Sequence, residues 1–185
     1  MMPTRDRPDA TLEEGAAPHR PTLRATLEFD DFYTANVRNL TSQLLAYTGS
    51  KQEAEDLVAE AFCRALDRWK KVREYQNPTA WVRRVAWNLA TSQLRRRGVV
   101  QRFLNRQRET YETAPDGDRV DLMRALAGIP PNHRKAVILR YMAGLTVTEI
   151  AEQEGAAEAT VRSWLHRGKA ALAERLSVQD EKEQQ

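Results

Sequence analysis

Apolar residues recur at steps of three and four over most of the chain, a spacing that predicts amphipathic helices. The clearest run follows Ser50, which with Glu53 three residues later has the pattern of a helix-starting capping box. The eight apolar positions of this run fall on one stripe of a helix. They are Ala54, Leu57, Val58, Ala61, Phe62, Ala65, Leu66 and Trp69.

The same period predicts helices on both sides of this run. Asp30 or Asp31 can cap a preceding helix that ends at Gly49, and Pro78 suits the first turn of a following helix that continues to Leu94. Further helices are expected from Asp118 and over 136–141. No segment alternates as a strand does, so the predicted fold class is all-α.

Glycines and prolines at the element boundaries divide the chain into two small helical domains joined by a flexible linker. Prolines and cancelling charges predict a disordered extension over 1–26. The first domain is placed at 27–97, the linker at 98–118, the second domain at 119–177 and a disordered tail at 178–185.

The second domain contains the pattern of a helix-turn-helix. A capping box at Thr146 and Glu149 opens a short helix, and Gly155 stands where a left-handed residue ends it. Ala157 and Glu154 fit less well, because a cap residue and an apolar residue are expected there. The second helix presents donors suited to phosphates and base edges, namely Thr160, Arg162, Ser163, His166 and Arg167.

Charge is concentrated in one belt, although the whole chain carries only +3 and has a pI of about 9.2. Between Arg68 and Arg108 stand twelve Lys or Arg against the single acid Glu74, a net charge of +11. Such density favours a polyanionic partner. Trp81 and Trp87 are interleaved with the arginines and could stack on unpaired bases, but the core is the better interpretation for both.

The helix before this belt has the opposite sign. Glu53, Glu55, Asp56 and Glu60 lie off its apolar stripe, and Asp56 and Glu60 share one face because they are four residues apart. A solvated helix surface is the ordinary interpretation, whereas a protein-docking face is the functional one.

Composition excludes several classes of protein. The single cysteine, Cys63, forms no intrachain disulfide, and the three histidines have no metal-ligand spacing. No apolar run approaches the roughly 20 residues that span a bilayer, and no hydrophobic signal core is present. We therefore expect a cytoplasmic protein with no cofactor, no metal and no membrane insertion.

Three motifs together resemble the extracytoplasmic-function (ECF, group 4) sigma factors of the sigma-70 family. Residues 54–65 resemble the polymerase-binding helix, and residues 81–97 resemble the helix that reads the −10 promoter element. Residues 122–176 resemble the domain that reads the −35 element. Departures from the family pattern are Ala59, Ser92, Ala157 and Ala159.

The resemblance implies a sigma region 2 at 27–97, a sigma region 4 at 119–177 and a function without catalysis. The partners would be bacterial core RNA polymerase, through its largest-subunit clamp helices and β flap, and promoter DNA, with an anti-sigma factor as a further candidate. The implied polymerase-binding residues are Glu55, Asp56, Leu57 and Glu60. The −10 residues would be Arg83, Arg84, Asn88, Arg95, Arg96 and Arg97, and the −35 residues would be the five named above on the second helix of the helix-turn-helix.

Two other classes of function compete with this hypothesis. A conventional regulator would bind an operator alone, as a dimer, with 27–97 as a sensor or dimerisation domain, but it leaves the acidic helix and the basic belt unexplained. An enzyme such as a recombinase or deaminase lacks support, because no nucleophile–base pair or metal spacing occurs in the sequence.

Overall fold

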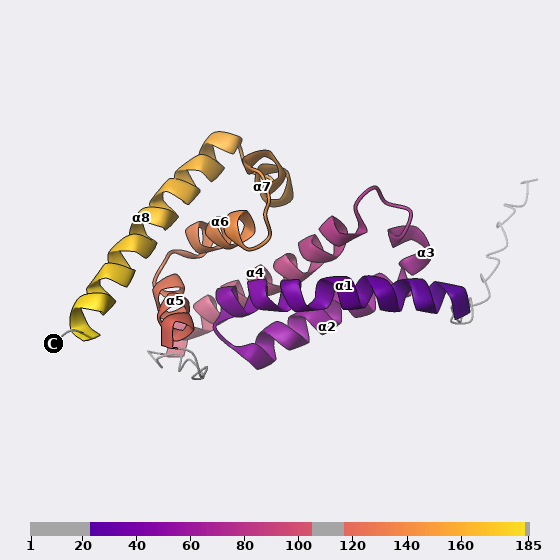
Figure 1. Cartoon of the computed structure of the whole chain (residues 1–185), viewed down its shortest axis with the longest axis horizontal. Helices are drawn as coiled ribbons and strands as arrows, with labels where there is room; N and C mark the ends of the chain where they lie inside the picture. Colours follow the sequence, from indigo (N-terminus) through magenta and orange to yellow (C-terminus); the bar gives the residue numbers. More distant parts are fainter. Residues whose placement is uncertain (1–22, 105–116, 184–185) are drawn as a thin grey trace, which may run out of the picture.

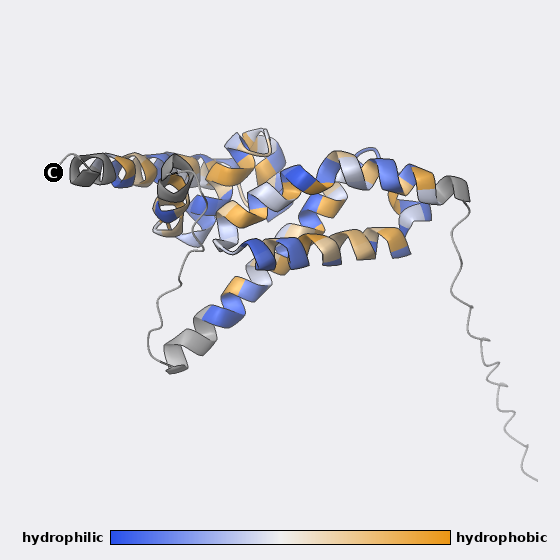
Figure 2. Ribbon diagram, turned by 60° about the horizontal axis from the view of Figure 1, so that its bottom comes forward, coloured by the Kyte–Doolittle hydropathy of each residue, from blue (hydrophilic) through white to orange (hydrophobic). Residues whose placement is uncertain are grey.

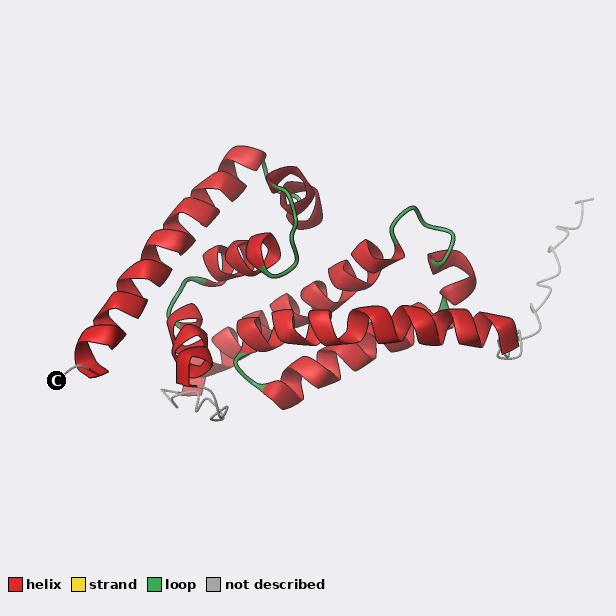
Figure 3. Cartoon of the chain, viewed as in Figure 1, coloured by secondary structure: helices red, strands yellow, loops and turns green. Residues whose placement is uncertain are grey.

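The computed structural model describes residues 23–104 and 117–183, and within these ranges all regular structure is helical (Figure 3). The first helices are α1 (Leu23–Thr48), α2 (Lys51–Asp67), α3 (Trp69–Val72) and α4 (Pro78–Leu104). They are followed by α5 (Gly117–Ala127), α6 (Pro131–Tyr141), α7 (Val147–Glu154) and α8 (Glu158–Glu183). The all-α prediction is confirmed.

Helices α1, α2 and α4 pack lengthwise and form the N-terminal domain, with the short α3 at one end (Figure 1). Seven of the eight positions of the predicted apolar stripe are buried, and Leu66 is exposed. The stripe was predicted on one helix, but α2 ends at Asp67 and its last position, Trp69, begins α3. Beside α3, Phe29 lies edge-on to Trp69 with ring centroids 5.2 Å apart. Phe29, which precedes the predicted caps Asp30 and Asp31, is thus part of α1 and of the core.

Helices α5 to α8 form the C-terminal domain. α8 packs on α5, α6 and α7 and lies along the outer edge of the molecule (Figure 1). Gly168 allows a close approach, because a Cβ there would lie 2.7 Å from Val137 Cγ2 and 3.1 Å from the His133 carbonyl oxygen.

Several predicted helix ends are wrong. Neither Asp30 nor Asp31 caps a helix, since α1 begins at Leu23. Residues 98–104, predicted as linker, continue α4, and residues 178–183, predicted as a disordered tail, continue α8. Gly98 costs only about 1 kcal/mol relative to alanine in a helix, and neither stretch contains a proline, so each helix can continue. The rest of the predicted extension, linker and tail lies outside the described residues.

The capping box predicted at Ser50 forms only half. The Ser50 hydroxyl accepts a hydrogen bond from the Glu53 backbone N–H at 3.4 Å. The Glu53 carboxylate instead accepts from Arg97 Nη1 at 2.6 Å, which joins α2 to α4. A long-range ion pair has replaced the local contact that the sequence pattern predicts.

Candidate nucleic-acid and polymerase interfaces

The helix-turn-helix begins with a complete capping box at α7. The Thr146 backbone N–H donates to Glu149 Oε2 at 2.7 Å, and the Glu149 N–H donates to the Thr146 hydroxyl at 3.2 Å. The backbone N–H of Thr146, followed by its hydroxyl, lowers the pKa of Glu149. Gly155 ends the helix with φ 63°, the left-handed conformation that glycine adopts at least cost. Both sequence predictions are confirmed.

The second helix of the motif lacks a side-chain cap, because Ala157 precedes Glu158 at its start. The Thr148 hydroxyl on α7 donates to Glu158 Oε1 at 2.6 Å, and this bond lowers the pKa of Glu158. This hydrogen bond between side chains joins α7 to the start of α8, which has no serine or threonine cap.

The predicted −35 residues lie on the outward side of α8. Val161 is fully buried on the inward side with Ile150 of α7, which fixes the rotation of the helix. Arg162 forms an ion pair with Glu158 one turn earlier, so its guanidinium is held along the helix surface. Thr160, Arg162, His166 and Arg167 are exposed, and Ser163 is half-buried.

The predicted −10 residues of α4 are not equivalent. Asn88, Arg95 and Arg96 are exposed, whereas Arg97 is engaged by Glu53. The described part of α4 that precedes its grey end is mostly hydrophilic (Figure 2).

Two arginines at the other end of α4 face the C-terminal domain. Arg83 Nε donates to Gln153 Oε1 at 3.0 Å, and Arg84 Nη2 donates to the Glu152 carbonyl oxygen at 3.3 Å. Arg83 is half-buried there, and burial lowers the pKa of its guanidinium. These partners on α7 were not predictable from the sequence, since they lie about 70 positions away.

The two tryptophans of α4 belong to the core, as the sequence pattern favoured. Trp87 is fully buried, and its Nε1 donates to Gln43 Oε1 at 3.2 Å. Trp81 is half-buried and packs against the core. Trp87 is therefore not available for base stacking in this arrangement.

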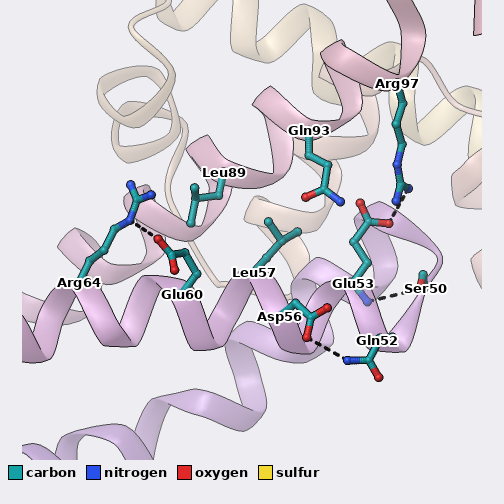
Figure 4. Close-up of a pocket in the computed structure, with 10 residues that line it drawn as sticks. All are labelled: Ser50, Gln52, Glu53, Asp56, Leu57, Glu60, Arg64, Leu89, Gln93 and Arg97. Atoms are coloured by element: carbon teal, nitrogen blue, oxygen red, sulfur yellow. Dashed lines mark hydrogen bonds and ion pairs between the residues drawn. The ribbon is translucent and has the colours of Figure 1, made fainter. Parts of the chain in front are cut away.

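The acidic surface of α2 borders a groove of about 520 Å³ between α2 and α4 (Figure 4). Asp56 accepts from Gln52 at 2.9 Å, and Glu60 accepts from Arg64 at 2.8 Å. Glu55 is exposed and lies 3.8 Å from Lys51. Leu57 is only 7% exposed and forms part of the groove lining, so it supports the acidic surface from beneath.

Metal binding and membrane insertion are two further functions that the described residues can be examined for. The described ranges contain no group of three or more His, Cys, Asp or Glu side chains placed to hold a metal ion. In the same ranges, no helix combines the length and apolar character that a bilayer crossing requires.

Both domains are similar to known protein families. A family model for sigma-70 region 2 matches residues 32–100, and one for sigma-70 region 4 matches residues 119–172. The ECF RNA polymerase sigma factor SigE of Mycolicibacterium smegmatis is 34% identical over 149 aligned residues, covering 72% of this chain and 56% of that protein.

Other relatives are covered over more of their length. SigL of Mycobacterium tuberculosis is 31% identical over 157 residues, which cover 80% of this chain and 87% of that protein. The RNA polymerase sigma-E factor of Streptomyces antibioticus is 32% identical over 131 residues, with coverage of 69% and 73%.

A solved structure has a similar arrangement of helices. The sigma factor RpoE of Bartonella quintana, in complex with the anti-sigma factor NepR, aligns with a TM-score of 0.73 and 26% identity. The alignment covers 82% of this chain and 98% of that chain. The chain therefore belongs to the ECF RNA polymerase sigma factors of the sigma-70 family, which act in transcription initiation and are not enzymes.

Proposed function

We propose that this chain acts in the cytoplasm by bringing core RNA polymerase to promoters through three separate surfaces. The observation that carries the proposal is the separation of charge: the acidic residues Asp56 and Glu60 are exposed on α2, while exposed basic residues lie on α4 and α8. One surface suits a basic protein partner and the other two suit phosphates.

The acidic surface is assigned to the polymerase. Glu55, Asp56 and Glu60 would contact the clamp helices of the largest subunit, and Leu57 would hold the surface in place from below. The C-terminal domain would lie near the β flap. Each exposed carboxylate is already paired with a neighbour on α2, so these partners must be exchanged for the basic groups of the polymerase on docking.

The two basic surfaces are assigned to promoter DNA. α8 would enter the −35 major groove with the five outward-facing residues, in the manner of a recognition helix. α4 would grip the −10 region with Arg83, Arg84, Asn88 and Arg95 to Arg97. Opened single strands are held by such arginine-rich surfaces through their phosphates.

An anti-sigma factor is a further candidate partner. The similar sigma chain from Bartonella quintana was solved in complex with NepR. Affinity purification of this chain from its own cells, followed by mass spectrometry, would identify such a protein.

Run-off transcription tests the proposal directly. The purified chain is added to core polymerase with genomic fragments, and we expect defined transcripts that core polymerase alone does not produce. Failure to direct initiation at any fragment would overturn the assignment. Tight operator binding by a dimer of the chain without polymerase would favour a conventional regulator instead.

Charge reversal locates the polymerase surface. We expect Asp56→Lys with Glu60→Lys to abolish co-purification with core polymerase, because like charges would then meet at the interface. The control is Asp30→Lys with Asp31→Lys, which makes the same change in charge at exposed positions of α1. Retained binding by the Asp56/Glu60 variant, or equal loss in the control, would contradict the assignment of this surface.

A further inference from the structure

The two domains contact each other along a seam that contains buried charges. α1 packs on α5 and α6, and α4 faces α7. Arg134 and Lys135 of α6 lie in this seam with exposures of 7% and 5%. Charged side chains are rarely buried to this degree unless they are paired. The partners of these two side chains therefore indicate how the domains are held together.

Arg134 is held by the end of α1. Its Nη1 donates to the Tyr47 carbonyl oxygen at 3.0 Å, and its guanidinium carbon lies 5.3 Å from the centre of the Tyr47 ring. Its Nε is buried without a hydrogen-bond partner. An unsatisfied buried donor costs free energy. This cost lowers the net stability that Arg134 gives to the contact between the domains.

Lys135 is held from both domains. Its Nζ lies 2.6 Å from Glu154 Oε2 in its own domain, donates to Thr91 Oγ1 of α4 at 3.2 Å, and lies 5.4 Å from the centre of the Trp87 ring. Glu154 occupies a position where the helix-turn-helix pattern favours an apolar residue. The structure gives this departure a role, because Glu154 neutralises a lysine buried against the other domain.

The same seam covers part of the −10 surface. Arg83 and Arg84 donate to Gln153 and to the Glu152 carbonyl oxygen on α7, the first helix of the −35 domain. A cavity of about 320 Å³ lies between α4 and α7 and is lined by both arginines together with Trp81. A DNA strand cannot occupy the positions of the α7 groups that these arginines bind.

We propose that the free chain adopts this closed arrangement, in which α7 of the −35 domain covers Arg83 and engages the still exposed Arg84, and that Lys135 with Glu154 is its latch. This inference rests on the proposed DNA-binding role of the two arginines. Apolar side chains of both domains meet in the seam, but it also holds the charged and polar contacts above, a buried unsatisfied donor and a cavity, and we expect these features to make the closed state reversible. Binding to polymerase or DNA then requires the domains to separate.

The latch can be weakened without altering a proposed DNA contact. Glu154→Gln leaves the Lys135 ammonium buried against Trp87 without its counter-ion, and an uncompensated buried charge strongly disfavours the state that buries it. Gln153→Ala, which removes the acceptor of Arg83, is a second and milder variant. Glu174→Gln removes the same charge at an exposed position of α8 and serves as the control.

Distance measurements on the full chain test the closed state. Donor and acceptor dyes are attached to the native Cys63, which is exposed on α2, and to a cysteine introduced by Asn132→Cys on α6. We expect high transfer efficiency in the wild-type chain and the control, and lower efficiency in Glu154→Gln. Low efficiency in all three would overturn the proposal, as would high efficiency in all three with unchanged circular dichroism.

DNA binding tests the masking. The probe is a labelled single strand that carries the −10 non-template sequence of a promoter identified by run-off transcription. If the closed state holds about 90% of the free chain, opening raises apparent affinity about tenfold. Equal affinities for wild type and an opened Glu154→Gln chain would refute masking. If no promoter is found, the proposed function fails, but the distance measurement still decides whether the chain is closed.

Discussion

At the scale of single residues, Gly168 determines how closely α8 approaches α6. The spacing of seven residues from the buried Val161 places Gly168 on the inward side of α8, where the Val137 side chain and the His133 backbone carbonyl both stand opposite it. A side chain can move away from a new methyl group, whereas a carbonyl in a helix moves only with the helix.

We therefore expect Gly168→Ala to lower the free energy of unfolding by about 1 kcal/mol. The gain in helix propensity is about 1 kcal/mol, and overpacking costs about 1–3 kcal/mol. Urea denaturation measures the change. Adding Val137→Ala removes the nearest atom, so the double variant should lose less stability than the sum of its parts. A more stable Gly168→Ala protein would contradict the close approach.

The capping box of α7 makes a prediction about pH. The pKa of Glu149 is lowered in the folded chain by donation from Thr146, so its carboxylate stabilises the fold above its ordinary value of 4.5 and this contribution is lost as pH falls through the lowered pKa. Glu149→Gln should therefore be less stable than wild type at neutral pH, with the difference shrinking as pH falls below 4.5 through the lowered pKa. Thr146→Ala removes only the hydroxyl and keeps the backbone N–H that is the main donor to Glu149, so it should reduce this dependence without abolishing it and cost about 1 kcal/mol. A difference that is constant with pH would exclude this role.

At the scale of helices, the sequence predicted elements well and their ends less well. The α2 stripe and the α7 cap are local patterns of period and side-chain chemistry, which one segment specifies by itself. The start of α1 and the short α3 meet through Phe29 and Trp69, a contact across 40 positions. No local pattern encodes such a contact.

In the candidate site, too, local features followed from the sequence and contacts between distant elements did not. The outward face of α8 followed from its helical period, because Val161 and Gly168 fix which side is buried. The partners of Arg83, Arg97 and Lys135 did not follow, since each is a charged contact between elements far apart in sequence. Glu154 was the only local sign of the seam, as a charge at a position where an apolar residue is expected.

The outward face of α8 predicts an effect on −35 binding. Arg162→Ala with Arg167→Ala should weaken binding to duplex DNA that carries the −35 element, and should lower the slope of log K against log salt by about 1 for each phosphate that the variant no longer neutralises. Co-purification with core polymerase should remain, because neither arginine lies on α2. Equal loss of both activities would point to misfolding or to a wrong assignment of the helix.

At the scale of the whole molecule, the arrangement of charge matters more than its total of +3. The basic surfaces of the two domains would repel each other if they met directly. In the closed arrangement α7 lies between α4 and α8 and supplies Gln153, the Glu152 carbonyl and Glu154 to the cations of the seam. The first helix of the helix-turn-helix thus serves as a polar layer between two DNA-binding surfaces.

This layer makes the balance between closed and open chain dependent on pH. Burial lowers the pKa of Lys135 from its ordinary 10.5, although the Glu154 carboxylate acts in the opposite direction. The closed state therefore releases the lysine proton at a lower pH than the open state, and closure should become more favourable as pH rises from the lowered pKa toward 10.5. Burial also raises the pKa of the neighbouring Tyr47 above its ordinary value. Transfer efficiency between Cys63 and the introduced cysteine should thus increase with pH. In the double variant Lys135→Met with Glu154→Gln this change should disappear, and an identical pH response in that variant would assign it to other groups.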